Sequence, residues 1–301
     1  MFGTREAFSV ATCSDCGSRL LLDPPADPAA AYPPGYYSLG PIGHFEAPDN
    51  AKRRALRALS SALLRLPVPV ADRVLERAPL AWMPFRWFAG RRVRTTSRIL
   101  DVGSGTGFLV RRLALAGFRR LLGVDPHLEV EFSAESVTLR RAELGEVGGE
   151  FDVVMFHHVL EHLDDPPASL REARERLATA GTIVVRVPLA DSLAARRYGA
   201  DWCQLDVPRH LSVPTEAGVR RAAERAGLRV ERAYRDSDPM QFWGSEQYRL
   251  GIPLTDPRSL ANGGEGGPFS RAQLRAWGAR TRTLNRAGDG DSGCFVLAAA
   301  D

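Results

Sequence analysis

The chain has few cysteines, no long apolar run and a single lysine, Lys52, among its 40 basic residues. Four cysteines in 301 residues, unevenly spaced, are too few for the disulfide framework of a secreted domain. No segment reaches the roughly 20 apolar residues that a membrane-spanning helix needs, and the N-terminal residues lack the pattern of a signal peptide. We therefore expect reduced thiols and a cytoplasmic protein.

Excess charge of one sign is also lacking, because 36 acidic residues nearly balance the basic ones and leave a net charge of +4. The basic residues are spread along the chain in company with the acids, so nothing requires a nucleic-acid partner. The length suits one large α/β domain with additions. The sequence leaves the oligomeric state open.

The organisation of the chain predicts three parts. Residues 1–48 are rich in Pro, Gly and Tyr and read as an irregular segment. Residues 49–95 should form a helical lid or linker, because apolar residues recur at helical spacing among arginines over residues 51–66. That basic helix, with the aromatic cluster at 82–88, either packs on the core or makes weak contact with a membrane surface. Residues 96–301 form the main domain, with an insertion at about 237–292.

Strands and helices alternate from residue 98 onward, which is typical of a parallel sheet with helices on both faces. We expect seven strands, at RILDV, LLGVD, SVTL, FDVVMFH, TIVVRVP, LRVERAY and CFVLAAA. The predicted fold class is α/β, a Rossmann-like, mostly parallel sheet. It carries an N-terminal helical and irregular extension and an insertion before the last strand.

A glycine-rich turn, DVGSGTG at residues 101–107, joins the first of these strands to an amphipathic helix. Glycine permits tight turning and close approach of a ligand to the backbone, and the helix start offers free N–H groups. Dinucleotide sites use the spacing G-x-G-x-x-G, whereas the spacing here is G-x-G-x-G. The second strand ends in Asp125, whose carboxylate can accept hydrogen bonds from both hydroxyls of a ribose. As an alternative, Asp125 is a turn residue before Pro126.

These motifs together resemble class I S-adenosylmethionine-dependent methyltransferases, specifically the bacterial group related to the ubiquinone and menaquinone enzymes. RILDVGSGTGFLVRRLALAG with LLGVDP is similar to that family's first two motifs, and FDVVMFHHVLEHLDDP with ATAGTIVVRVP to its fourth and fifth. The resemblance covers residues 98 to about 235. It implies S-adenosylmethionine as cofactor, bound by residues that begin with Asp101 and Gly103 at the methionine end and Asp125 at the ribose. The full set of cofactor residues is Asp101, Gly103, Ser104, Gly105, Gly107, Asp125, Ala142, Glu143 and His157.

Two parts of that cofactor set depend on alignment with the family. The family places an acidic residue shortly after the third strand to meet the adenine, but here Arg141 occupies that position and Ala142 and Glu143 follow it. Adenine contact is therefore assigned to Glu143 or to the Ala142 backbone. His157, at the end of the fourth strand, is assigned to the position that faces the methyl group.

Methyl transfer from a sulfonium mainly requires positioning of the nucleophile and, for a hydroxyl acceptor, removal of a proton. Histidine suits that task near neutral pH. His210 is the first candidate for the base and His157 the second, while His162 belongs to the LEHL motif and is assigned a structural role. The alternative for His157 is an ordinary satisfied polar residue.

The stretch WCQLDVPRHL at residues 202–211 resembles an insertion of the family that closes over the acceptor. Trp202, Arg209 and His210 are therefore predicted to contact the acceptor. The alternative is that Arg209 and His210 cap the next helix. No Asn/Asp-Pro-Pro-Tyr/Phe motif follows the fourth strand, so oxygen or carbon acceptors are favoured over amino groups.

Cys13 and Cys16 have the spacing of half a zinc site, but tetrahedral zinc needs four ligands and no second pair exists. The segment resembles the rear half of the zinc ribbon that precedes related sugar and glycan methyltransferases. His44 is the only remote third ligand. We predict no metal site.

The first hypothesis is an enzyme that methylates a hydroxyl of a small molecule or glycan. The alternative is carbon methylation of a quinone-like lipid at a membrane surface. The third hypothesis is a module without catalytic activity that binds a cofactor or a nucleic acid. A complete zinc site and a concentrated basic face would indicate such a module.

Overall fold

The computed structural model describes residues 6–25, 31–32, 51–75, 83–262 and 267–300. Helices and strands fall into two units. Unit 1 comprises residues 1–34, 158–167 and 186–295, and unit 2 comprises residues 35–157, 168–185 and 296–301. Much of the N-terminal segment and the zinc-ligand candidate His44 lie outside the described residues.

The main sheet has eight hydrogen-bonded strands in the order β10-β11-β8-β7-β3-β4-β6-β5. Their bounds are β3 Arg98–Val102, β4 Arg120–Val124, β5 Phe132–Ser133, β6 Val137–Arg140, β7 Phe151–His157, β8 Leu177–Pro188, β10 Leu228–Arg235 and β11 Ser292–Ala299. A second sheet pairs β1 Val10–Thr12, β2 Arg19–Leu21 and β9 Ser212–Val213. All seven predicted strands are thus confirmed, and β5 and the second sheet are additions that the sequence did not reveal.

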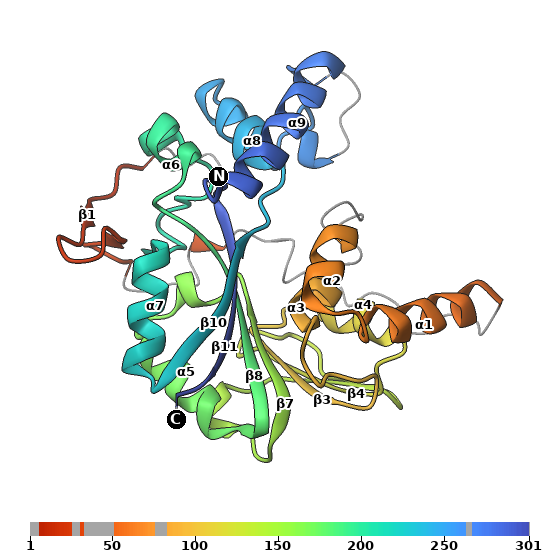
Figure 1. The fold of residues 1–301 in the computed structure, drawn as a ribbon. Coiled ribbons are helices and arrows are strands. Elements are labelled where there is room, and N and C mark those ends of the chain that lie inside the picture. Colours follow the sequence, from red (N-terminus) through yellow and green to blue (C-terminus); the bar gives the residue numbers. More distant parts are fainter. Residues whose placement is uncertain (1–5, 26–30, 33–50, 76–82, 263–266, 301) are drawn as a thin grey trace. The chain divides into compact units, whose positions relative to one another are not determined.

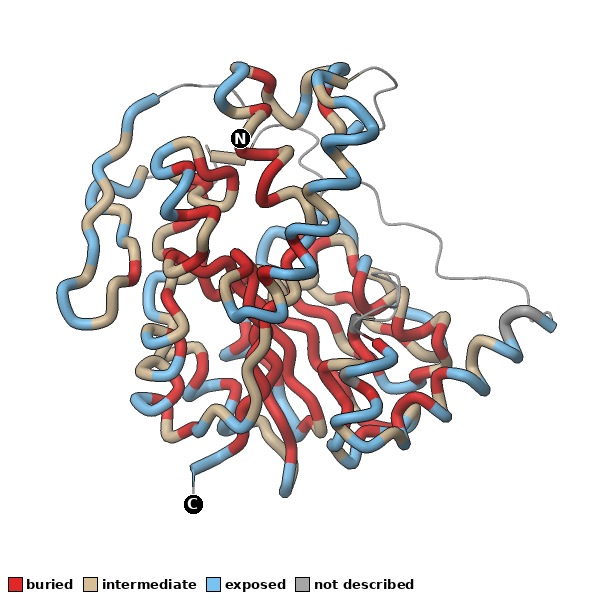
Figure 2. The backbone as a smooth tube through the Cα atoms, turned by 45° about the horizontal axis from the view of Figure 1, so that its top comes forward, coloured by how far each residue is buried: buried red, intermediate tan, exposed pale blue. Residues whose placement is uncertain are grey.

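Within unit 2, β3 runs parallel to both β4 and β7, and Asp101 of β3 is paired with Gly123 of β4 and Met155 of β7 (Figure 1). Burial drives this arrangement, because successive residues of β7 from Val153 to Phe156 are fully enclosed. Figure 2 shows these strands as buried tubes. The carboxyl ends of β3 and β4 therefore lie beside each other, at the edge where open α/β sheets bind ligands.

Unit 2 also contains the helices α1 Ala51–Leu63, α2 Val68–Leu75, α3 Met83–Phe88 and α4 Phe108–Leu115. The predicted basic helix is present, but it ends at Leu63, and Leu59 is 49% exposed while Leu63 and Leu64 are buried. Residues 83–88 of the aromatic cluster form α3, where Phe85, Trp87 and Phe88 are buried, and Trp82 lies outside the described residues. No helix of the described residues is long and apolar enough to cross a bilayer.

Unit 1 holds most of the remaining helices: α6 Leu193–Tyr198, α7 Glu216–Arg225, α8 Met240–Arg249 and α9 Arg271–Ala287. The helix α5 Pro166–Glu175 begins there and continues in unit 2. Helices α6 and α8 were not predicted from the sequence. Trp202, Tyr198 and Phe242 form the centre of an apolar cluster around these helices.

Candidate cofactor and acceptor sites

The glycine-rich turn of unit 2 adopts the conformation that its sequence predicts. Gly103, Gly105 and Gly107 have φ angles of 65°, 50° and 75°, in the left-handed region that residues with a Cβ rarely adopt. Gly107 is the N-cap of α4 and no side chain caps this helix. The turn therefore leaves N–H groups at the start of α4 available to a polar ligand.

Gly123 of β4 makes room for this turn, a role that the sequence motifs did not signal. A Cβ at this position would lie 2.7 Å from the Ser104 hydroxyl oxygen and 2.7 Å from a Leu139 methyl carbon. The Ser104 N–H donates to the Val124 carbonyl at 3.0 Å, so the turn folds back onto β4. Within the described residues the buried Ser104 hydroxyl has no hydrogen-bond partner.

The two predicted aspartates of the cofactor site have different surroundings. Asp125 accepts hydrogen bonds from the Gly105 N–H and the His127 N–H, each at 2.9 Å, and so ties the turn to the end of β4. Asp101 is 3% exposed. Burial and the nearby negative charge of Asp125 raise the pKa of the Asp101 carboxyl to about 8. The two carboxyls thus form one acidic pair beside the turn.

The residues assigned to adenine differ in accessibility: Ala142 is buried and Glu143 is exposed. The Glu143 side chain accepts a hydrogen bond from the backbone of Glu146, whose carboxylate accepts the Glu143 N–H at 2.9 Å. This capping box opens the short helix η3 Leu144–Glu146. The Arg141 side chain is hydrogen-bonded to an earlier segment of the chain, because its Nε–H donates to the Leu128 carbonyl at 2.6 Å.

His157 ends β7 and is half-buried. Its ring lies 5.5 Å from the Trp87 ring of α3, at 41°. Trp87 is therefore an aromatic neighbour that holds this imidazole, and the tryptophan was not singled out for that role by the sequence.

His158, the next residue, belongs to unit 1 and lies in the left-handed region with φ 58°. Its Nδ1 is 3.0 Å from Glu161 Oε1, and its Nε2 is in close contact with Nη1 of the buried Arg186. Because a guanidinium can only donate, Nε2 accepts and Nδ1–H donates to Glu161. Arg186 also donates from Nε to both Asp236 carboxylate oxygens, at 3.0 and 2.9 Å. Burial and the charge of Arg186 hold the pKa of His158 well below its usual value.

His210 is 5% exposed, and its Nδ1 lies 2.9 Å from the Gln204 carbonyl. Burial lowers the pKa of its imidazole to about 3. His162 packs edge-on against it with ring centroids 4.7 Å apart, and the His162 Nδ1 lies 2.9 Å from the Arg209 carbonyl. The structure therefore brings His210 together with the LEHL motif.

The other residues predicted to contact the acceptor are buried and have protein partners. The Trp202 indole N–H donates to Asp291 at 3.0 Å. Arg209 forms a buried ion pair with Asp206 and donates to the Ala31 carbonyl at 3.1 Å. The alternative role as caps of α7 is wrong, because Thr215 caps that helix by accepting the Gly218 N–H at 3.0 Å.

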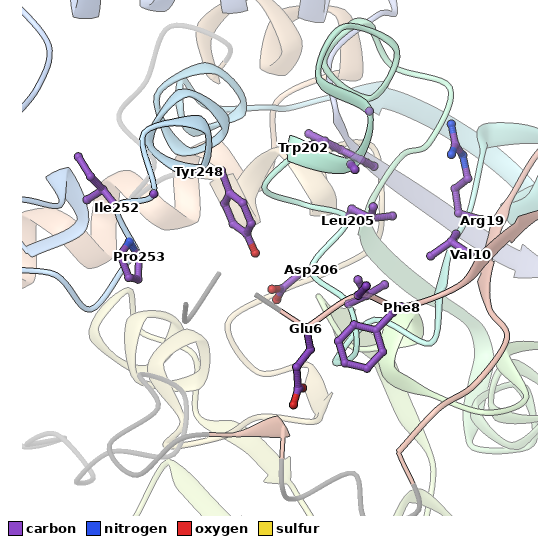
Figure 3. Close-up of a pocket in the computed structure, with 15 residues that line it drawn as sticks. Glu6, Phe8, Val10, Arg19, Trp202, Leu205, Asp206, Tyr248, Ile252 and Pro253 are labelled. Carbon is purple, nitrogen blue, oxygen red and sulfur yellow. The ribbon is translucent and has the colours of Figure 1, made fainter. Parts of the chain in front are cut away.

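Unit 1 also contains a cavity of about 510 Å³, a volume typical of small-molecule sites. Trp202, Leu205, Asp206 and Tyr248 line it, together with residues of the N-terminal segment such as Phe8 (Figure 3). Figure 3 shows the Tyr248 hydroxyl and the Asp206 carboxylate directed into this space. Arg209 and His210 do not line it.

Cys13 and Cys16 lie at the turn between β1 and β2, and both are free thiols. In the described part of the chain, no third His, Cys, Asp or Glu groups with them closely enough to share a metal ion. The turn is attached to α7 instead: the Thr215 hydroxyl donates to the Cys16 carbonyl at 2.6 Å, and Asp15 pairs with Arg221.

Comparison with known proteins identifies the family. The model of a methyltransferase domain matches residues 53–233. A tRNA U34 carboxymethyltransferase of Alcanivorax borkumensis is 30% identical over 151 residues, which are 44% of each chain. A ubiquinone biosynthesis O-methyltransferase of Xanthomonas oryzae is 30% identical over 131 residues, 38% of this chain and 53% of that protein. The chain thus spans about half the length of these relatives.

The fold is also similar to that of solved structures. The cyclopropane synthase MmaA2 of Mycobacterium tuberculosis superposes with a TM-score of 0.45 and 16% identity, over 85% of this chain and 88% of that one.

Proposed function

Because the chain belongs to the methyltransferase-domain family, we propose that it transfers a methyl group from S-adenosylmethionine to a hydroxyl group of a small molecule or glycan. The observation that carries this proposal is the cavity of unit 1, whose lining combines aromatic rings with a carboxylate. Aromatic faces bind the apolar faces of rings, and a carboxylate accepts hydrogen bonds from hydroxyls. The O-methyltransferase relative acts in ubiquinone biosynthesis, which also favours oxygen as the acceptor atom.

S-adenosylmethionine supplies a sulfonium methyl group with an excellent leaving group. We assign its binding to the turn of residues 101–107 and to Asp125, since this turn combines left-handed glycines, an unpartnered Ser104 hydroxyl and uncapped N–H groups. Ala142, Glu143 and His157 complete the assignment, as the family resemblance implies. The protein's own task is to hold the donor, orient the acceptor hydroxyl and take up its proton.

For proton removal, we place His157 ahead of His210, which reverses the order favoured by the sequence. His157 is half-buried and its ring is held by Trp87, whereas His210 is 5% exposed and burial lowers its pKa to about 3, which makes it a weak base. We expect His157→Gln to lower turnover about a hundredfold. Cofactor affinity, measured separately, reports whether His157 also contacts S-adenosylmethionine.

Trp202 is proposed to contact the acceptor directly. Arg209 is proposed to act through Asp206, whose carboxylate lines the cavity while Arg209 holds it in place. The alternative acceptor is a carbon of a quinone-like lipid. The proposal places the enzyme in the cytoplasm and requires no nucleic-acid partner.

The test is methyl transfer from radiolabelled S-adenosylmethionine to a panel of phenols, catechols and sugars. Tyr248→Phe removes a hydroxyl that lines the cavity, and we expect it to raise the acceptor KM about two- to tenfold. The matched control is Tyr198→Phe, because that hydroxyl donates to Glu246 at 2.8 Å and does not line the cavity. Equal KM values in both variants would exclude this cavity as the acceptor site.

A further inference from the structure

We propose that Glu161, His162 and His210 bind a divalent transition-metal ion of the zinc class, contrary to the expectation that the chain has no metal site. One ligand atom of each residue lies within 4.8 Å of those of the other two. Two imidazoles and one carboxylate form a ligand set used by zinc enzymes, in which three protein ligands leave a position open. All three residues belong to unit 1.

The hydrogen bonds of the two histidines determine which nitrogens are free. A backbone carbonyl can only accept, so Nδ1–H of His162 donates to Arg209 and Nδ1–H of His210 donates to Gln204, both at 2.9 Å. In the neutral imidazole, Nε2 is therefore the nitrogen that carries the lone pair. A metal-binding histidine usually donates its other ring N–H to a carbonyl or carboxylate in this way, which fixes its tautomer and orientation.

The carboxylate of Glu161 provides the second, independent observation. Its side chain is 0% exposed, and Oε1 accepts the His158 Nδ1–H at 3.0 Å. Among the described residues, Oε2 is buried without any hydrogen-bond partner. A buried carboxylate oxygen left unsatisfied costs free energy, and a cation held at Oε2 would remove that cost. A purely structural role for the two histidines explains their Nδ1 contacts but not this oxygen.

A set of outer residues holds the carboxylate in place. His158 receives a hydrogen bond from Arg186, and Asp236 binds Arg186 through both carboxylate oxygens. The Ser292 hydroxyl lies 3.2 Å from Asp236 Oδ1. Hydrogen-bonded groups of this kind orient the residues that bind a metal ion directly, and they are characteristic of metal sites in proteins.

The mixture of ligands selects the kind of ion. Mg²⁺ and Ca²⁺ prefer sites made only of oxygen, whereas imidazole nitrogen suits Zn²⁺ and its neighbours in the first transition row. Binding of the ion does not depend on the proposed methyl transfer.

The experiment uses the full chain, stripped with a chelator and titrated with Zn²⁺ against a chromophoric competitor. We expect one ion per chain, and Co²⁺ in its place should give a visible d–d absorption band. Substitution of a residue that supports a metal ligand typically weakens metal binding by roughly 10- to 100-fold. We expect a larger loss of Zn²⁺ affinity in each of the three ligand variants, Glu161→Gln, His162→Gln and His210→Gln. His158→Asn should fall within that 10- to 100-fold range and shift the cobalt band.

The double variant Cys13→Ser, Cys16→Ser is the matched control, since it removes the other candidate ligands and should bind Zn²⁺ like the unchanged chain. Circular dichroism and S-adenosylmethionine affinity establish that each variant is folded. Loss of the ion in the cysteine variant, unchanged affinity in all three ligand variants, or no stoichiometric binding would each overturn the metal site. Tight Zn²⁺ binding combined with methyl transfer to carbon would overturn the proposed function alone.

Discussion

The cofactor turn of unit 2 and the histidine cluster of unit 1 are built in opposite ways. The turn uses backbone geometry supplied by seven consecutive residues, and Asp125 joins it from the adjacent strand. The histidine cluster uses side chains from four separated segments, namely residues 158–162, Arg186, His210 and Asp236. A local turn can be recognised from spacing alone, whereas a cluster assembled by the fold cannot.

The largest effect is expected where the cluster holds a buried charge. Arg186→Met leaves Asp236 buried without its cation, and such a loss typically costs about 3–5 kcal/mol of unfolding free energy. The double variant Arg186→Met, Asp236→Leu should recover much of that loss, because it removes both charges. Chemical denaturation measures both. A double variant no more stable than the single one would show that the pair is not the cause.

The next prediction tests the backbone conformation of the glycine-rich turn by a substitution at Gly105. Gly105→Ala places a Cβ at φ 50°, so we expect cofactor affinity to fall by about tenfold or more. Gly199→Ala is the control, because Gly199 has φ 58° with open space around its added Cβ and lies in unit 1. Calorimetry with S-adenosylmethionine measures both. Equal loss of affinity would mean that strain, rather than the position in the turn, explains the effect.

An effect of pH on the stability of the folded chain is also expected. The Asp101 pKa is about 8 in the folded chain and near 3.8 in the unfolded one, so the folded state keeps a proton that the unfolded state releases. Stability of the cofactor-free protein should therefore fall as pH rises from about 4 to about 8 and then level off. The difference in Tm between wild type and Asp101→Asn isolates this group. If the difference does not change with pH, the assigned pKa is wrong.

The smallest effect is expected at the helix cap of α7. Thr215→Ala removes the side-chain acceptor of the Gly218 N–H and the donor to the Cys16 carbonyl, and we expect a loss of about 1 kcal/mol. Turnover per folded molecule should be unchanged. Thermal denaturation and an activity assay on the same sample check both, and a selective loss of turnover would connect the cap to catalysis.

The sequence predicted the parts whose determinants are local. The seven strands of the main fold and the membership of the methyltransferase-domain family are confirmed. The S-adenosylmethionine cofactor and the methyl-transfer activity are proposals that this membership supports. The strands were recognised by buried apolar runs between turns, and the turn by its glycines. The predicted division at residues 48 and 95 and the individual site residues stay predictions.

The sequence missed features that depend on distant contacts. Gly123 is unremarkable in sequence, and its role depends on Ser104 folding back onto β4. Helices α6 and α8 lie in segments without a clear apolar period, and packing around Phe242 stabilises them. The LEHL histidine and His210 are 48 positions apart, and only the folded chain places their rings together.

The most direct test of the central claim determines which atom receives the methyl group. The protein is incubated with cofactor carrying a carbon-13 methyl group and with the panel compound that accepts radiolabel, and the product is examined by NMR. Transfer to a hydroxyl predicts a methoxy signal in the product. The same reaction with the His157→Gln variant, at the same enzyme concentration and a short reaction time, should give no methoxy signal. A carbon-bound or nitrogen-bound methyl signal would contradict the account.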